Sequence, residues 1–184
     1  NPQLNILVVS ASKNRADDFS TFTLRLINEI DVLAHLRPRE DQRQSKVSFD
    51  VKPARASHAP SVKSLGITGQ LTGSRSDLVI ADDVESANNS ATMGMRDKLS
   101  EQVKEFESIL KPQGRIIFLG TMQTEMSLYN VLPTRGYKQR IWTARYPTEK
   151  QLNNFGNTIA PFIRNSWSTE MIGKPTDAER FDEE

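Results

Sequence analysis

The sequence contains no cysteine and only two histidines, His35 and His58. Disulfide cross-links, thiolate zinc sites and histidine-rich metal centres are therefore excluded. A divalent cation here would have to be held by carboxylates and hydroxyls. Long apolar runs are missing too: residues 6–9 and 116–119, the longest, are strand-length and far below the roughly 20 residues of a membrane span. We therefore expect no membrane segment.

A large excess of charge of either sign is also missing. The chain has 24 Lys and Arg against 23 Asp and Glu, for a formal net charge of +1. Any contact with nucleic acid must therefore be local or shared among subunits, because no whole-protein field attracts it. The 184 residues, 36% hydrophobic and 26% charged, suit about one globular domain. Residue 1 is Asn, and an apolar strand follows within a few residues, so we expect the sequence to begin inside a longer chain.

Apolar runs alternate with amphipathic stretches. Residues 4–10, 77–81 and 115–119 are continuous apolar runs typical of strands buried in a parallel sheet. Residues 15–36 and 92–110 place apolar side chains every three or four positions and predict helices. Weaker patterns predict a strand pair at 47–51 and 62–68, a short helix at 126–132, a strand at 137–144 and short helices beyond 147. This order predicts an α/β fold with a mostly parallel sheet flanked by helices.

In such a sheet, ligands gather beyond the carboxyl ends of the strands. Polar segments follow the predicted strands at residues 10–13, 82–85 and 120–124. The sharpest is the sequence Leu-Val-Ile-Ala-Asp-Asp at 78–83, a Walker B pattern. A rigid strand would aim Asp82 at the water shell of Mg²⁺, while Asp83, or Glu85 if the chain turns sharply, activates the attacking water. The structural alternative is an ordinary acidic turn after a strand.

Two further segments fit a phosphate site. Residues 66–75 contain three glycines, which permit close backbone approach, and end in Arg75, a cation that could sense a phosphate or contact another subunit. Gly120 and Thr121 follow the strand at 115–119, where a small residue and a hydroxyl could respond to loss of the terminal phosphate. Simple turn geometry is the alternative for the glycines.

One expected part is absent. No stretch matches G-x-x-x-x-G-K-[ST], the loop whose backbone and lysine hold a triphosphate in P-loop proteins. We expect this Walker A loop on the strand and helix just before residue 1, and the chain alone to be inactive.

The segment 37–63 is basic, with seven Lys and Arg against three Asp and Glu, net +4. Short charge clusters usually keep a surface hydrated, so we expect a solvated excursion from the main sheet. The alternative is a patch that faces phosphates or another subunit.

The chain closely resembles the large terminase subunits of short-tailed, podovirus-like phages in four segments: residues 10–22 (SASKNRADDFSTF), 61–85 (SVKSLGITGQLTGSRSDLVIADDVE), 89–99 (NSATMGMRDKL) and 118–132 (FLGTMQTEMSLYNVL). In that family, a packaging ATPase domain of the P-loop NTPase (ASCE) type precedes an RNase H-type nuclease. The resemblance implies that residues 1–147 are the central and C-terminal part of the ATPase domain. Residues 148–184 would be its helical end and a linker toward a nuclease domain that this sequence lacks.

The resemblance implies roles for single residues. Asp82 corresponds to the Walker B magnesium carboxylate and Asp83 to the neighbouring catalytic acid. Asp83 is shorter than the commoner glutamate, which leaves Glu85 as the alternative. Gly120 and Thr121 match the ATPase coupling motif.

Two positions depart from the pattern or remain open. Leu119 stands where many terminases have a small hydroxyl residue. Arg75 is the candidate for the arginine finger, which ring motors supply in trans.

The implied function is hydrolysis of ATP, with Mg²⁺, coupled to translocation of double-stranded DNA into the procapsid. The implied partners are double-stranded phage DNA, the portal protein, the small terminase subunit and further copies of the chain in a homo-oligomeric ring. The implied location is the host cell cytoplasm, with transient docking on the procapsid portal.

The residues alone leave two other functions open. One is a magnesium-dependent nuclease that uses Asp82, Asp83 and Glu85. The other is a non-catalytic oligomerisation or DNA-binding fragment that uses the basic segment 37–63.

Overall fold

The computed structural model describes residues 1–71, 73–122 and 124–180. The chain divides into two compact units, Asn1–Asn130 and Val131–Glu184. Each unit has its own cluster of buried apolar side chains. None of the helices in the described part of the chain is both long enough and apolar enough to cross a membrane.

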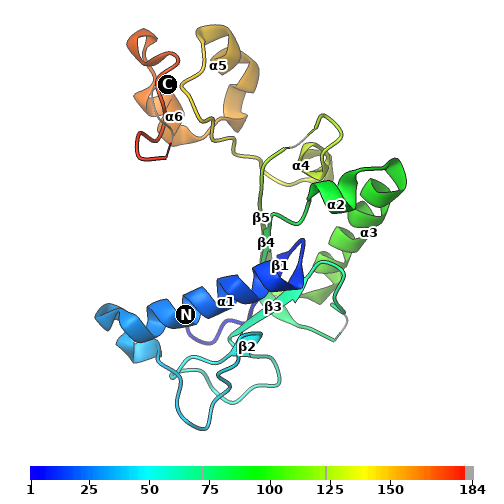
Figure 1. Ribbon diagram of the computed structural model, residues 1–184, viewed down its shortest axis with the longest axis vertical. Coiled ribbons are helices and arrows are strands. Elements are labelled where there is room, and N and C mark those ends of the chain that lie inside the picture. The colour runs from blue at the N-terminus through cyan, green and yellow to red at the C-terminus, as the bar shows by residue number, and fades with distance from the viewer. Residues whose placement is uncertain (72, 123, 181–184) are drawn as a thin grey trace. The chain divides into compact units, whose positions relative to one another are not determined.

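The first unit is built around a sheet (Figure 1). Its strands are β1 (Ile6–Ser10), β2 (Ser48–Phe49), β3 (Val62–Gly66), β4 (Ser76–Asp82) and β5 (Leu110–Leu119). Its helical segments are α1 (Lys13–Glu29), the 3-10 helix η1 (Asp31–Leu36), α2 (Ala87–Ser90) and α3 (Met93–Ile109). The short helix α4 (Leu128–Val131) begins in the first unit, and its last residue is the first residue of the second.

The five strands lie in the order β2-β3-β1-β4-β5. Strands β3, β1, β4 and β5 run parallel, and β2 pairs antiparallel with β3. The predicted α/β class is confirmed, but the sheet is mixed. The pairing of residues 47–51 with 62–68 is also confirmed, over Ser48–Phe49 only. The expected solvated excursion over residues 37–63 is wrong for its strands, because β3 lies between β2 and β1 and its Val62 joins the core. The rest of the segment is mostly exposed at residues 39–47 and 52–58, as expected.

Helix α1 covers one face of the sheet. Ser12 caps it, since its Oγ accepts a hydrogen bond from the Arg15 N–H at 3.3 Å. The core under α1 joins five buried residues, Val8, Ile27, Phe49, Val51 and Val62. The single helix predicted over residues 15–36 is wrong: Ile30 is extended and ends α1, and η1 follows. The apolar spacing continues across this break, because Leu33 and Leu36 pack on the same core.

Helix α3 covers the opposite face and confirms the helix predicted over 92–110. Its Phe106 is fully buried and packs against Phe118 of β5, with ring centroids 5.9 Å apart. Side chains alternate along a strand, so Ile117 and Leu119 project to the other face. There they are 44% and 49% exposed.

The second unit is largely helical. Its elements are η2 (Leu132–Arg135), α5 (Glu149–Phe155), η3 (Gly156–Thr158), α6 (Pro161–Ser166) and η4 (Thr169–Met171). Its core holds Tyr146, Leu152, Ile159, Ala160 and Ile163.

The strand predicted at residues 137–144 is wrong. The segment forms only an isolated bridge, in which the Ile141 N–H donates to the Thr158 carbonyl at 2.7 Å and the Ile141 carbonyl accepts from the Ala160 N–H at 2.8 Å. Residues 173–176, expected in a linker, are hydrogen-bonded to residues 144–146. The acidic end of that linker, 181–184, lies outside the described residues.

Candidate functional site

The carboxyl ends of three parallel strands meet at one rim of the sheet. Ser10 of β1 is in register with Asp82 of β4, and Asp82 is in register with Leu119 of β5. Strands β4 and β5 therefore end side by side, so Gly120 and Thr121, which follow β5, come next to Asp82 and Asp83 at the end of β4. The structure thus brings four of the candidate residues to one edge, as the parallel arrangement predicts.

Asp83 ties the ends of β5 and β1 together. Its backbone N–H donates to the Leu119 carbonyl at 2.9 Å, and its own carbonyl accepts from the Ala11 N–H at 3.3 Å. Its φ of +44° lies in the left-handed region, which is uncommon for a residue other than glycine. Aspartate tolerates this conformation better than most residues. The sharp turn of the chain considered after Asp82 therefore occurs at Asp83 itself.

The acid pair is partly neutralised by one cation. The Arg15 Nη1 lies 3.7 Å from Asp83 Oδ2, and the two side chains are 63% and 45% exposed. Burial raises the pKa of Asp82, the negative charge of Asp83 raises it further, and Arg15 opposes the shift. A second cation at this edge would stabilise the ionised form of Asp82.

These residues fit a magnesium ion. Two adjacent carboxylates supply the hard oxygen ligands that Mg²⁺ prefers, held at the end of a rigid strand. The Oγ of Ser10, in register with Asp82, is buried and lacks a hydrogen-bond partner among the described residues. Asp82 and Asp83 would hold the ion, directly or through its waters.

Glu85 has a different environment from the acid pair. Its side chain is only 6% exposed. Its Oε2 accepts hydrogen bonds from the Ser127 hydroxyl at 2.6 Å and from the Leu128 N–H at 2.8 Å. The carboxylate therefore satisfies the first N–H of α4 and anchors that helix to the loop after β4.

Tyr129 belongs to the site and was missed by the sequence analysis. It is 7% exposed, and its hydroxyl donates to the Leu119 carbonyl at 3.3 Å. Burial raises its pKa to about 12, and the charges of Asp83, Glu85 and Asp82 contribute. No spacing rule links Tyr129 to the acid pair, because the two lie on different elements far apart in sequence.

The glycines upstream have steric roles. Gly66 ends β3 beside the start of α1, and a Cβ there would lie 2.8 Å from the backbone nitrogen of Lys13. Gly73 has a φ of +84°, which favours glycine in the turn before β4. These observations explain two of the three glycines by chain geometry.

Arg75 is not brought to the acid pair. It precedes β4, whereas Asp82 ends that seven-residue strand, so at about 3.3 Å per residue the two lie roughly 20 Å apart. Its Nη1 donates to the Ser108 carbonyl at 3.4 Å. Within one chain, Arg75 is therefore at the opposite end of the sheet.

A three-carboxylate nuclease centre is not supported. Glu85 is engaged with Ser127 and Leu128. In residues 1–71, 73–122 and 124–180, no group of three or more histidine or acidic side chains is arranged to hold a metal ion.

Comparison with known proteins gives a relationship over the whole chain. No protein-family model matches it. Over 190 aligned residues it is 52% identical to the large terminase subunit of Enterobacteria phage T3. The alignment covers 100% of this chain and 32% of that subunit, so the chain spans about a third of the length of this curated relative. This similarity confirms the resemblance to large terminase subunits that was inferred from the sequence motifs. It extends over about a third of such a subunit.

Proposed function

We propose that the chain is part of a phage DNA-packaging ATPase of the P-loop NTPase (ASCE) type. Residues 1–147 would form the central and C-terminal part of the ATPase domain, and residues 148–184 its helical end and the linker to a nuclease domain. The observation that carries this proposal is the register that puts Asp82 and Asp83 beside Leu119, Gly120 and Thr121. The similarity to a large terminase subunit supports it independently.

In this proposal, Asp82 binds Mg²⁺ and Asp83 orients the attacking water. Bound Mg²⁺ neutralises charge on the terminal phosphates of the substrate ATP. The left-handed backbone of Asp83 ends the line of β4 at the acid pair, and Arg15 lies 3.7 Å from its carboxylate. Glu85 does not activate water, because its carboxylate caps α4.

The same edge contains a route for coupling. The Leu119 carbonyl accepts from both the Asp83 N–H and the Tyr129 hydroxyl. A shift of Asp83 after loss of the terminal phosphate would therefore move the start of the Gly120–Thr121 segment and, through Tyr129, helix α4. Arg75, at the other end of β4, would act in trans on the nucleotide of a neighbouring subunit.

The partners follow from the same proposal. They are double-stranded phage DNA, the portal protein, the small terminase subunit and other copies of the chain in a ring. The subunit would act in the host cell cytoplasm while docked on the procapsid portal.

The proposal is tested by ATP turnover in the full-length subunit that includes a Walker A loop. We expect Asp82→Asn to lower kcat by about a hundredfold or more. The matched control is Asp97→Asn, because Asp97 is an exposed acid on α3 that has no role in the proposed reaction. Turnover by the Asp82→Asn variant equal to that of the control would overturn the assignment. The 184-residue chain itself should show no turnover.

A further inference from the structure

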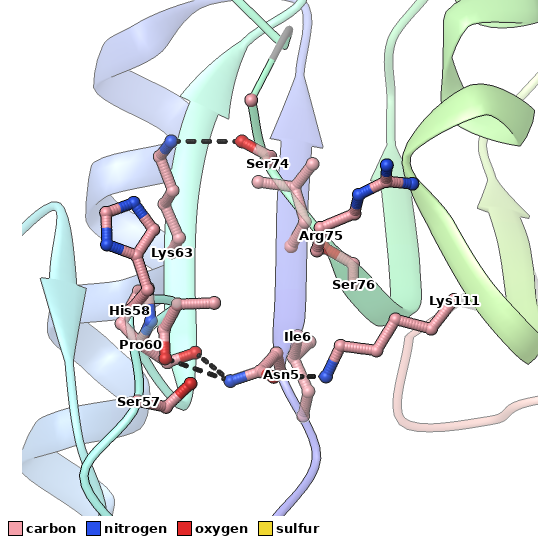
Figure 2. Close-up of a pocket in the computed structure, with 13 residues that line it drawn as sticks. Asn5, Ile6, Ser57, His58, Pro60, Lys63, Ser74, Arg75, Ser76 and Lys111 are labelled. Carbon is pink, nitrogen blue, oxygen red and sulfur yellow. Dashed lines mark hydrogen bonds between the residues drawn. The ribbon is translucent and has the colours of Figure 1, made fainter.

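A pocket of about 260 Å³ lies at the opposite edge of the sheet from the acid pair (Figure 2). The amino end of β1, the loop before β3, the turn before β4 and the first part of β5 form its walls. All of these elements belong to the first unit. Of the residues that line it, the proposed ATPase reaction uses only Arg75, and uses it in trans.

The lining of this pocket is basic. His58, Lys63, Arg75 and Lys111 line it, together with serine hydroxyls, and no carboxylate is among the described residues of its lining. Val62 packs in the core under α1, so the next residue, Lys63, points to the opposite face of the sheet. Strand geometry therefore directs this lysine into the pocket.

The donors of the pocket are held in place. The Lys63 Nζ donates to the Ser74 Oγ at 3.1 Å. An ammonium group has three donors, so two remain for a ligand. Lys63 and Arg75 form no ion pair within the described part of the chain.

A second layer of contacts fixes Lys111 and the loop with His58. Lys111 Nζ donates to Asn5 Oδ1 and to Asp77 Oδ2, the latter at 2.9 Å. Asn5 is 8% exposed, and its Nδ2 donates to the carbonyls of Ala59 at 3.0 Å and Pro60 at 2.8 Å. The walls on either side of β1 are thereby joined through one buried side chain, as Figure 2 shows.

We propose that this pocket binds a phosphate group. Lysine, arginine and serine donors line one pocket, and of its cations only Lys111 is paired with a carboxylate among the residues that the structure describes, that of Asp77. Such donors match the oxygens of a phosphate, and the charge of the ligand would offset that of Lys63 and Arg75. The phosphate can come from the backbone of DNA or from a free anion. The inference uses none of the residues at the acid rim and shares only Arg75 with the proposed ATPase reaction, so its test through Lys63 and His58 is separate from the test of Asp82.

The chain offers an internal reporter for the test. It contains only two histidines: His58 lines the pocket, and His35 lies in η1, outside it. Inorganic phosphate and a 20-base-pair duplex are each titrated into the 184-residue chain, and the ring-proton NMR resonances of both histidines are followed. We expect saturable shifts at His58 and none at His35.

Three variants distinguish binding of phosphate in the pocket from nonspecific attraction of the anion to the positive charges of the protein. Lys63→Gln should weaken the binding seen at His58 by about three- to tenfold. Lys63→Arg should restore it to within about twofold, which also shows that the position tolerates substitution. The control Lys98→Gln removes an exposed lysine on α3 and should bind like the unmodified chain.

The two ligand arms identify the source of the phosphate. Shifts at His58 with the duplex, lost as salt is raised, assign the pocket to the DNA backbone. Shifts with inorganic phosphate alone assign it to a small anion. Equal shifts at both histidines, no shift with either ligand, or unchanged binding by a folded Lys63→Gln variant would overturn the proposal.

Discussion

Tyr129 lies directly over Gly120. A methyl group at residue 120 would overlap with the hydroxyl and ring carbons of this tyrosine. The small residue at the end of β5 is therefore needed to let the ring reach the Leu119 carbonyl. Gly120, proposed as part of the coupling segment, is therefore also required for a steric reason.

We predict that Gly120→Ala destabilises the chain by about 1–3 kcal/mol, because the buried ring of Tyr129 must move. Urea unfolding measures the change. Gly94→Ala is the matched control: a Cβ at Gly94 meets no atom within 4 Å, and alanine favours the helix that contains it. Equal free energies of unfolding for Gly120→Ala and the unmodified chain would show that Tyr129 does not occupy this position.

The second prediction concerns pH. The pKa of Asp82 is raised in the folded state by burial and by Asp83, so the folded protein binds the proton more tightly than the unfolded chain. Stability is therefore lost as pH rises from the ordinary aspartate pKa of 3.8 through the higher pKa of the folded state. Asp82→Asn removes this cost, so the variant should be more stable than the unmodified chain at pH 7.

The difference should disappear below pH 3.8, where the carboxyl is protonated in both states. Denaturant unfolding at pH 3 and pH 7 measures it, with Asp97→Asn as the exposed control. If Asp82 serves the proposed reaction at a cost in stability, Asp82→Asn should be both inactive in the full-length subunit and more stable than the unmodified chain. A loss of stability in Asp82→Asn at pH 7 would contradict the raised pKa.

The third prediction separates Asp83 from Glu85. In the full-length subunit, Asp83→Asn should abolish ATP turnover with little change in stability, since its side chain is 45% exposed. Glu85→Ala should leave the Ser127 hydroxyl and the Leu128 N–H unpaired and cost about 1–3 kcal/mol. Below its unfolding transition, that variant should keep measurable turnover. A stable but inactive Glu85→Gln variant would assign the water-activating role to Glu85.

The sequence predicts the elements that bury a continuous or periodic set of apolar side chains. Strands β1 and β4 and helix α3 are of this kind, and so is the position of Asp82 at a strand end. Strand β5 was also predicted, but as a buried strand, whereas it lies at the edge of the sheet and none of its residues is buried. The break at Ile30 was missed because Leu33 and Leu36 keep the helical spacing and pack on the core beyond it. The strand expected at 137–144 failed because an alternating segment needs a neighbouring strand, and Ile141 finds only a single bridge.

The site was predictable only in part, for a similar reason. Asp82 and Asp83 follow their strand directly, so their place is fixed by the strand. The roles of Glu85 and Tyr129 depend on contacts with α4 and with β5, which no local pattern encodes. Likewise, the pocket of Lys63 and Lys111 joins three strands that are distant in sequence.

The fourth prediction compares the two faces of β5. Phe106→Ala should cost about 3–5 kcal/mol, because its ring is fully buried against Phe118. Leu119→Ser should cost less than about 1 kcal/mol, because this side chain is 49% exposed on the face that α3 does not cover. Urea unfolding of both variants gives the comparison.

Serine is also the small hydroxyl residue that the resemblance leads one to expect at this position, so the Leu119→Ser subunit should keep its ATP turnover. A cost for Leu119→Ser as large as that for Phe106→Ala would mean that something covers this face in solution.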